Sequence, residues 1–178
     1  MQRRLSFMVG GRAADAGVMA AARAHKAASR ATRVEGAPIT IVLVACAKKK
    51  LKVEAKARDL YTSALFKKAR GYAERNGDQW FILSALHGLV DPEKRLRPYN
   101  VTLRNYGKRE RELWALGRVL PALTTVAPAG SKIIVLAGRA YFENLEPELL
   151  RRGFEVVIPM RGMDLFLMMR WLKDAEGI

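Results

Sequence analysis

The sequence is short of cysteine, histidine and acidic residues, and each shortage excludes a class of protein. Its 178 residues include one cysteine, Cys46, so an intrachain disulfide framework is impossible and a cysteine-based zinc site is not expected. The two histidines, His25 and His87, lie far apart in the chain, which argues against a metal hydrolase. We therefore expect neither a metal nor another cofactor.

Long hydrophobic runs and nucleotide-binding fingerprints are also missing. The longest apolar runs, residues 39–46 and 165–169, are far shorter than the ~20 residues of a membrane span, and no segment has the apolar core of a secretory signal. We therefore expect a soluble, cytoplasmic protein with no membrane partner. Neither Gly-x-x-x-x-Gly-Lys nor Gly-x-Gly-x-x-Gly occurs, which argues against an ordinary nucleotide triphosphatase or dinucleotide enzyme.

The shortage of acidic residues leaves a large positive charge. Lys and Arg number 32 against 17 Asp and Glu, which gives a net charge of +15 and an isoelectric point near 10.4. A surface this basic attracts polyanions at long range. It predicts a partner rich in phosphates, nucleic acid first among them; a generally basic surface with no specific partner is the alternative.

The first part of the chain differs in composition from the rest. Residues 1–38 are dominated by alanine and by arginine or lysine, with only Asp15 and Glu35 as acidic residues. Alanine favours helix, but large apolar side chains to bury are almost absent. We therefore predict a basic arm over residues 1–38, flexible or loosely helical, followed by an α/β domain over residues 39–178. The arm could hold phosphates or be an unselected tail.

From residue 39, apolar strand-like segments alternate with helix-like segments. We expect strands near residues 39–46, 79–85, 132–137 and 154–159. Helices are expected near residues 62–76, 113–127, 139–152 and 163–173, and a long loop over residues 87–106. This alternation predicts an α/β fold, a single open, mainly parallel sheet of about four strands with helices on both faces. Such sheets bind ligands beyond the carboxyl ends of their strands.

Three residues near the expected strand ends are candidates for catalysis. Cys46 ends a strand beside lysines, and neighbouring cations favour the nucleophilic thiolate. His87 follows another strand, where an imidazole can transfer protons at neutral pH. Asp91 could orient that ring or act as a carboxylate itself. The alternatives are structural: Cys46 as a small buried residue, and His87 as a residue that fixes its loop.

Basic residues cluster after the same strands and could bind phosphates. A basic loop between a strand and a helix suits an anion, because side chains and helix N–H groups can both point at it. The candidates are Lys48, Lys49, Lys50, Arg58, Arg95, Arg97 and Arg139. The alternative is that these side chains are simply solvated.

A base-binding pocket is predicted beside them. Aromatic rings interleaved with cations suit a nucleic-acid strand, because the rings stack on bases while the cations neutralise phosphates. The candidates for this pocket are Ser84, Gly88, Tyr99 and Tyr141. Packing of the two tyrosines against the edge of the core is the alternative.

Four segments resemble a bacterial and phage domain family that is distantly similar to the YaaA peroxide-stress proteins. They are residues 46–51, 58–66, 83–92 and 98–103. The YaaA pattern Leu-Ser-Gly-x-Tyr-Gly-Leu-x-x-Pro, followed by Pro-Tyr, matches Leu83 to Pro92 and Pro98-Tyr99, with His87 in place of the tyrosine. A weaker likeness is to the accessory domain of archaeosine synthase and related tRNA transglycosylases, where a Pro-Cys-Ser segment and a lysine match Cys46 and Lys49.

These resemblances imply a role on nucleic acid. The YaaA proteins are associated with DNA binding and with protection of DNA during oxidative stress, and the second family with base modification. We therefore expect a nucleic-acid-binding α/β protein that recognises or processes a base, by glycosidic-bond or base-modification chemistry, with DNA favoured over RNA. Two alternatives stay open: a non-catalytic DNA-binding stress-protection protein, and an enzyme acting on a small nucleotide or phosphorylated metabolite. Whether the chain is an enzyme, and its oligomeric state, cannot be read from the sequence.

Overall fold

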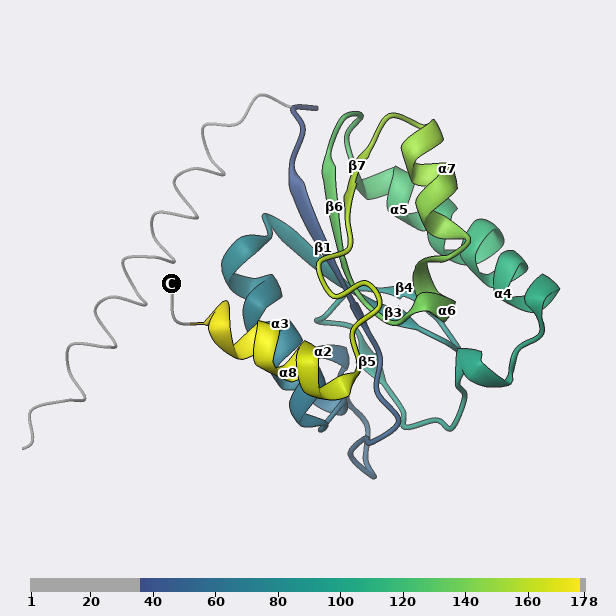
Figure 1. Ribbon diagram of the computed structural model, residues 1–178. Coiled ribbons are helices and arrows are strands. Elements are labelled where there is room, and N and C mark those ends of the chain that lie inside the picture. Colours follow the sequence, from purple (N-terminus) through teal and green to yellow (C-terminus); the bar gives the residue numbers. More distant parts are fainter. Residues whose placement is uncertain (1–35, 177–178) are drawn as a thin grey trace, which may run out of the picture. The chain divides into compact units, whose positions relative to one another are not determined.

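The fold is organised around β1 (Thr40–Ala45), whose residues 41–44 are at most 1% exposed (Figure 1). The computed structural model describes residues 36–176. Within them, β1 lies between β3 (Gln79–Ser84) and β6 (Lys132–Leu136), and both neighbours run parallel to it. The strand is therefore buried on both faces, which is what an unbroken run of apolar and β-branched residues predicts.

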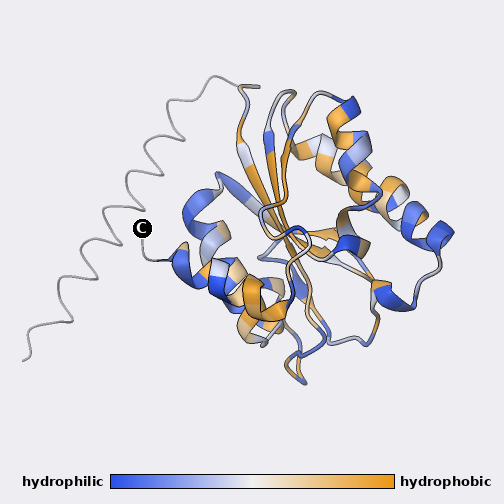
Figure 2. Cartoon of the chain, in the orientation of Figure 1, coloured by the Kyte–Doolittle hydropathy of each residue, from blue (hydrophilic) through white to orange (hydrophobic). Residues whose placement is uncertain are grey.

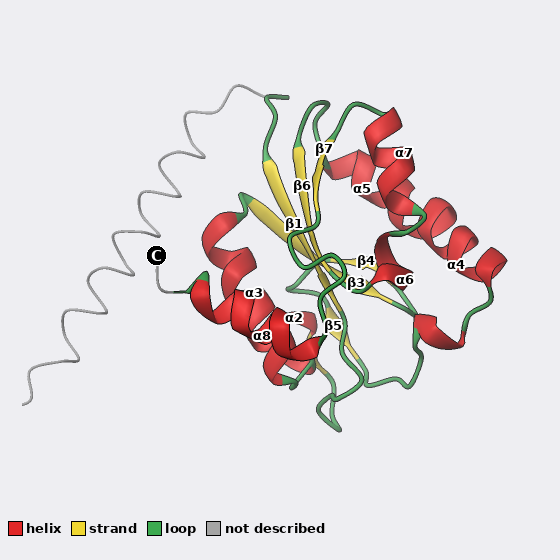
Figure 3. Cartoon of the chain, viewed as in Figure 1, coloured by secondary structure: helices red, strands yellow, loops and turns green. Residues whose placement is uncertain are grey.

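The main sheet has five strands in the order β4-β3-β1-β6-β7 (Figure 3). β7 (Glu155–Val157) is parallel to β6, whereas β4 (Gly88–Val90) is antiparallel to β3. β2 (Ala55–Lys56) and β5 (Arg95–Leu96) form a separate antiparallel ribbon. The predicted open, mainly parallel sheet is confirmed, with five strands where the sequence predicted about four.

The additional strands lie where the sequence predicted mainly loop. β4 has three residues, and β2 and β5 have two each, so none is long enough to display the alternation by which strands are recognised. β4 exists because the chain reverses tightly after β3, with Ser84 paired to Gly88. Gly88 has a φ of +75°, a left-handed conformation that glycine adopts without strain.

Helices cover both faces of the sheet, as predicted (Figure 2). One face carries α2 (Ala57–Leu60), α3 (Ala64–Asn76) and α8 (Leu165–Asp174). The other face carries η1 (Leu103–Asn105), α4 (Lys108–Trp114), the π-helical turn η2 (Ala115–Val119), α5 (Leu120–Val126), α6 (Arg139–Phe142) and α7 (Leu145–Arg151). Each face has its own apolar core, so β1 contributes alternate side chains to two cores.

Two predicted helices differ in detail from the structure. The helix predicted near residues 113–127 begins at Lys108 and contains η2 just before Pro121. A proline ring clashes with the preceding turn of a regular α-helix, and a wider π turn relieves that clash. The helix predicted over residues 139–152 is divided into α6 and α7.

The start of α3 follows the sequence closely. Ser63 is the N-cap, and its side-chain oxygen accepts a hydrogen bond from the backbone N–H of Phe66 at 3.2 Å. The predicted basic arm lies outside the described residues except for residues 36–38. Within residues 36–176, no helix has the length and apolar character that crossing a bilayer requires.

We predict that Gly88→Ala destabilises the domain more than Gly153→Ala. Both glycines have positive φ, at +75° and +81°, so either alanine incurs the left-handed penalty of about 1–2 kcal/mol. At Gly88 the new Cβ would also lie 3.1 Å from Cβ of Arg118, whereas at Gly153 nothing lies within 4 Å. Urea denaturation of the two variants measures the difference, and equal losses would contradict the close approach of Gly88 to η2.

Candidate functional site

At the carboxyl ends of the neighbouring strands β1 and β6, the chain continues into connections that pass over opposite faces of the sheet. The connection that leaves β1 runs through α2 and α3 on one face, and the connection that leaves β6 runs through α6 and α7 on the other. In open α/β sheets this arrangement leaves a crevice that ligands use. The structure has a cavity of about 70 Å³ here, lined by Val44, Ala45, Cys46, Ala47, Ser63, Leu65, Phe66, Ala69, Leu136, Ala137, Gly138, Met160 and Met168.

This cavity is small and mostly apolar. Pockets that enclose drug-sized ligands have volumes of roughly 300–1,000 Å³, so the cavity admits a few atoms and not a nucleobase. A larger ligand at this edge must therefore lie over the cavity, in contact with the polar side chains around it.

Cys46 is the first of these side chains. Its backbone N–H donates to the carbonyl of Leu83 at 2.9 Å, which extends the pairing of β1 with β3 by one residue. The half-buried thiol lies 3.3 Å from the hydroxyl of Tyr141 on α6. Burial, followed by the proximity of Cys46, raises the pKa of Tyr141, so the phenol stays protonated beside the sulfur at neutral pH.

Two further tyrosines bring their hydroxyls to Ser84 at the end of β3. Tyr99 lies 2.7 Å from Oγ of Ser84 and 2.7 Å from the hydroxyl of Tyr61. Burial raises the pKa of Tyr61 to about 12 and also raises that of Tyr99. Three neutral hydroxyls therefore form a chain behind the edge, and the backbone N–H of His87 donates to the same Ser84 oxygen at 3.0 Å.

Lys50 covers these tyrosines rather than pointing away from them. Its ammonium lies 4.3 Å from the ring centre of Tyr99 and 5.5 Å from that of Tyr61, within the range of cation–π attraction. It also donates to the carbonyl of Ala47 at 2.8 Å. Burial lowers the pKa of Lys50, while neighbouring Cys46 acts in the opposite direction. Lys50 therefore lines the site, and its ammonium has less conformational freedom to contact a phosphate than that of an exposed lysine.

His87 lies at the exposed side of the same group. Its ring meets Tyr99 edge-on, with 5.3 Å between ring centres. Partial burial, followed by the positive charges of Lys94 and Arg118, lowers the pKa of His87. The imidazole is therefore neutral at pH 7 and can accept a proton or a hydrogen bond.

The structure brings together five of the predicted catalytic and base-pocket residues. Direct contacts link Cys46 to Tyr141, and Ser84 and Tyr99 to His87. The tyrosine and tryptophan that complete the group, Tyr61 and Trp114, were not predicted. Trp114 donates from its indole N–H to the Ser84 carbonyl at 2.9 Å and packs edge-on against Tyr141. Tyr61 directly follows α2 and lies within the segment 58–66 that carries the family resemblance, which is the signal that could have singled it out; Trp114 ends α4, and no short motif marks it.

Asp91 and Gly88 do not join this group. Ser84 pairs with Gly88 and Ile82 pairs with Val90, so Asp91 lies three residues, or roughly 10 Å, back along the hairpin from the edge. Its carboxylate accepts the backbone N–H of Glu93 at 2.7 Å. Gly88 is buried within β4 against Arg118. Both positions shape the hairpin, and their roles in catalysis and base binding stay predictions.

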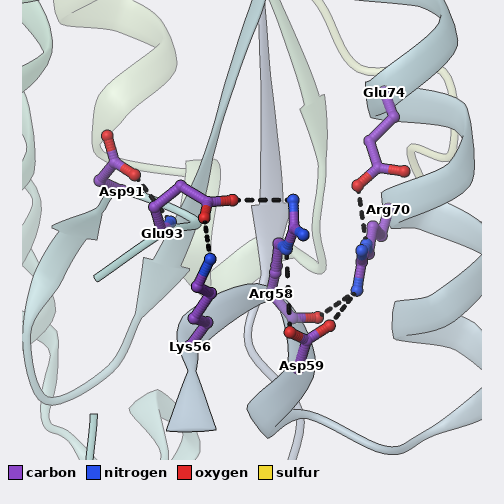
Figure 4. A network of polar contacts seen from close by, with 7 residues as sticks. All are labelled: Lys56, Arg58, Asp59, Arg70, Glu74, Asp91 and Glu93. Atoms are coloured by element: carbon purple, nitrogen blue, oxygen red, sulfur yellow. Dashed lines mark hydrogen bonds and ion pairs between the residues drawn. The ribbon is translucent and has the colours of Figure 1, made fainter. Parts of the chain in front are cut away.

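The predicted phosphate-binding residues fall into two groups. The arginines are ion-paired: Arg58 with Glu93 at 2.8 Å (Figure 4), Arg95 and Arg97 with Glu54 at 2.8 and 3.6 Å, and Arg139 with Glu143 at 3.4 Å. Lys48 and Lys49 are exposed and form no ion pair with any residue in 36–176. Lys48 and Lys49 therefore present charge that no carboxylate among residues 36–176 shares, whereas each of the four arginines lies beside a carboxylate.

Three further cations lie near the site. Lys94 and Arg118 act on His87, and Arg104, which the sequence places among the cations around Tyr99, acts on Tyr141. Within the part of the chain that the structure describes, none of the three pairs with a carboxylate, and Arg118 donates to the carbonyl of Leu86 at 2.8 Å. Only the folded geometry could distinguish Lys94 and Arg118 from other basic residues in the sequence.

Residues 36–176 contain no cluster of three or more His, Cys, Asp or Glu side chains that could hold a metal ion. The chain belongs to a family of unknown function, DUF6884, whose model matches residues 41–174. No curated protein and no solved structure matches the chain. The family match covers every element that builds the group around Cys46.

We predict that the imidazole of His87 titrates below pH 6.5 and that Lys94→Gln raises its pKa. The lysine charge disfavours the imidazolium, so removing it makes protonation easier. Nuclear magnetic resonance of the ring carbons measures both values, with His25→Ala to assign the signal. A wild-type pKa at or above 6.5 would contradict the environment described for His87.

Proposed function

We propose that the carboxyl edge of the sheet binds nucleic acid and holds a base against the group formed by Cys46, Ser84, His87, Tyr99 and Tyr141. The observation that supports this most strongly is a contrast in charge. Five cations near this group are without carboxylate partners among residues 36–176, whereas the four predicted arginines each lie beside a carboxylate. A site that binds a polyanion needs cations that are not already neutralised.

The unpaired cations approach the site from three segments. Lys48 and Lys49 follow β1, Lys94 and Arg104 belong to the segment between β4 and α4, and Arg118 lies on η2. A small phosphorylated ligand would need one compact anion pocket. Cations that come from separate segments suit a backbone with successive phosphates, which favours a polymer over a metabolite.

The base would meet aromatic and hydrogen-bonding groups. His87 and Tyr99 offer ring edges and faces, and neutral His87 can accept a hydrogen bond from a base edge. The cavity of about 70 Å³ is too small for a base, so we propose that the base lies over it. The resemblance to the YaaA proteins favours DNA over RNA, and a cytoplasmic location accords with the single cysteine.

A reaction at this site would use Cys46 and His87. The thiol is placed by the Tyr141 hydroxyl at 3.3 Å, and His87 is positioned by Ser84 and is neutral at pH 7. We propose Cys46 as the nucleophile and His87 as the acid or base in glycosidic-bond or base-modification chemistry. A protein that only docks on DNA is the alternative.

We predict that Lys48→Gln/Lys49→Gln weakens nucleic-acid binding and makes it less sensitive to salt. Each phosphate contact contributes about 0.9 to the slope of log affinity against log salt on duplex DNA, so the double variant should lose a slope of about 2. Fluorescence anisotropy with labelled double-stranded DNA, single-stranded DNA and tRNA, at several salt concentrations, measures both changes.

The matched control is Arg75→Gln/Lys173→Gln. It removes the same charge from the last turns of α3 and α8, at the opposite edge of the sheet, from two exposed side chains. If both double variants reduce affinity and slope equally, the binding is a general effect of charge and the proposed edge is wrong. If the wild-type protein binds none of the three polymers at about 0.15 M salt, the proposed function fails.

We predict that Cys46→Ala and His87→Ala leave affinity within about threefold of wild type but abolish any change in the bound nucleic acid. Neither residue is placed to contact phosphates, so the loss of affinity should stay under about 0.7 kcal/mol. Mass spectrometry of nucleosides, after incubation of the protein with modified and unmodified oligonucleotides, measures the reaction. Unchanged products in both variants would remove the two residues from the chemistry.

A further inference from the structure

The first turn of α8 exposes an apolar surface. Leu165, Phe166 and Leu167 are 63%, 73% and 45% exposed, and Figure 2 shows the beginning of the helix in orange. Isolated exposed apolar residues are common, but a contiguous group marks an interaction site more often. Farther along the helix, Leu172 is fully buried and Trp171 packs against Tyr72 of α3.

This turn is held in a fixed conformation. Asp164 is the N-cap of α8, and its carboxylate accepts the backbone N–H of Leu167 at 2.9 Å. The cap satisfies one of the free amides at the helix start and limits fraying there. The exposed side chains therefore project from a rigid support, which lowers the entropy that insertion into a partner would cost.

The apolar turn lies at the same edge of the sheet as the candidate site. α8 begins after the carboxyl end of β7, which runs in the same direction as β1. Met168 of α8 lines the cavity that Cys46 and Ala47 also line. Leu165, three residues before Met168, lies on the same side of the helix, and Phe166 is next to Leu165 in the same exposed turn. In Figure 1 the beginning of α8 lies toward the end of the domain that carries the loop after β1.

The charges around this turn fit a polyanion. Lys48 and Lys49 follow Ala47 at the far side of the cavity. Arg161 and Arg170 flank the turn in sequence but pair with Glu146 and Asp174, so the unpaired positive charge near the turn comes from Lys48 and Lys49. The acidic residue of the turn itself, Asp164, is occupied by its bond to the backbone of Leu167.

We propose that the first turn of α8 inserts Phe166 between neighbouring bases of the bound nucleic acid and unstacks them. Apolar side chains that project between cations act in this way in proteins that bend or open a duplex. Unstacking would help a base leave the helix and reach the edge where Cys46 lies, because an enzyme cannot contact a reactive atom within an intact stack. This inference rests on the proposed function and adds a specific means of opening the substrate.

A protein partner and a membrane surface are the other candidate occupants of this apolar turn, and each would need different features around it. A stable protein partner buries roughly 800 Å² on each side, far more than three side chains supply. A membrane surface would also accept an apolar turn with nearby cations, but the unpaired cations lie beside the aromatic group around Cys46 and not along α8. The arrangement therefore favours nucleic acid.

We predict that Phe166→Ala loses base unstacking but retains most of the affinity. The probe is a duplex that carries 2-aminopurine, whose fluorescence rises when its neighbours unstack, together with a terminal dye for anisotropy in the same sample. Wild-type protein should raise the 2-aminopurine signal severalfold at saturation. Phe166→Ala should return that signal to within about 20% of the free duplex while the dissociation constant changes less than tenfold, or about 1.4 kcal/mol.

Leu150→Ala is the matched control, because Leu150 is a 53% exposed leucine near the end of α7. It should leave both readouts unchanged. Binding by wild type with no rise in 2-aminopurine fluorescence, or a full rise with Phe166→Ala, would overturn the insertion and leave the proposed function standing. Absence of binding by anisotropy would overturn both. If Phe166→Ala loses binding to anionic vesicles while the 2-aminopurine signal stays intact, the turn belongs to a membrane contact. If it loses dimers while that signal stays intact, the turn belongs to a contact with a second copy of the chain. Either result would overturn insertion.

Discussion

The parallel pairing of β1 with β3 and β6 is the constraint on which the rest of the structure depends. Residues 41–44 are nearly inaccessible to solvent on both faces, so every backbone polar group of this strand must be satisfied by its two neighbours. Because crossovers between parallel strands are right-handed, the connection from β1 to β3 and the connection from β6 to β7, which move in opposite directions across the sheet, pass over opposite faces. Cys46 stands where the two connections diverge, so its position follows from the topology of the sheet.

A second constraint brings Tyr99 to this point. The segment between β4 and η1 has no regular element longer than β5, yet it is bound to α2 by backbone hydrogen bonds from Ala57 to Lys94 at 2.8 Å and from Arg58 to Pro92 at 3.0 Å. The ion pairs of Glu93 in Figure 4 lie beside these bonds. Exposed ion pairs add little on their own, so the backbone bonds set the geometry. The backbone N–H of Arg58 therefore holds this segment, while its guanidinium is ion-paired with Glu93; binding of a phosphate by Arg58 stays a prediction.

Residues that follow long strands could be predicted to lie together, and residues on short elements could not. Cys46 follows and Ser84 ends a strand of six residues, and their meeting at one edge follows from parallel pairing. Asp91 lies away from that edge because the hairpin of β3 and β4, with a strand of three residues, carries it back. The contribution of Tyr61 depends on the bridge between Lys50 and Tyr61, which no periodicity in the sequence reveals.

Charge shows a second limit of prediction from the sequence, because the net charge does not tell which lysine and arginine side chains are available to a ligand. Arg95 and Arg97 appear in the sequence as part of a basic segment, but both lie beside Glu54, forty residues earlier. Lys48 and Lys49 follow a strand with no acidic residue before Glu54, and they reach solvent unpaired. The cations that remain available are therefore those beside which the fold places no acidic residue. Lys48 and Lys49 are such cations, and they lie at the edge where Tyr141 contacts the Cys46 thiol.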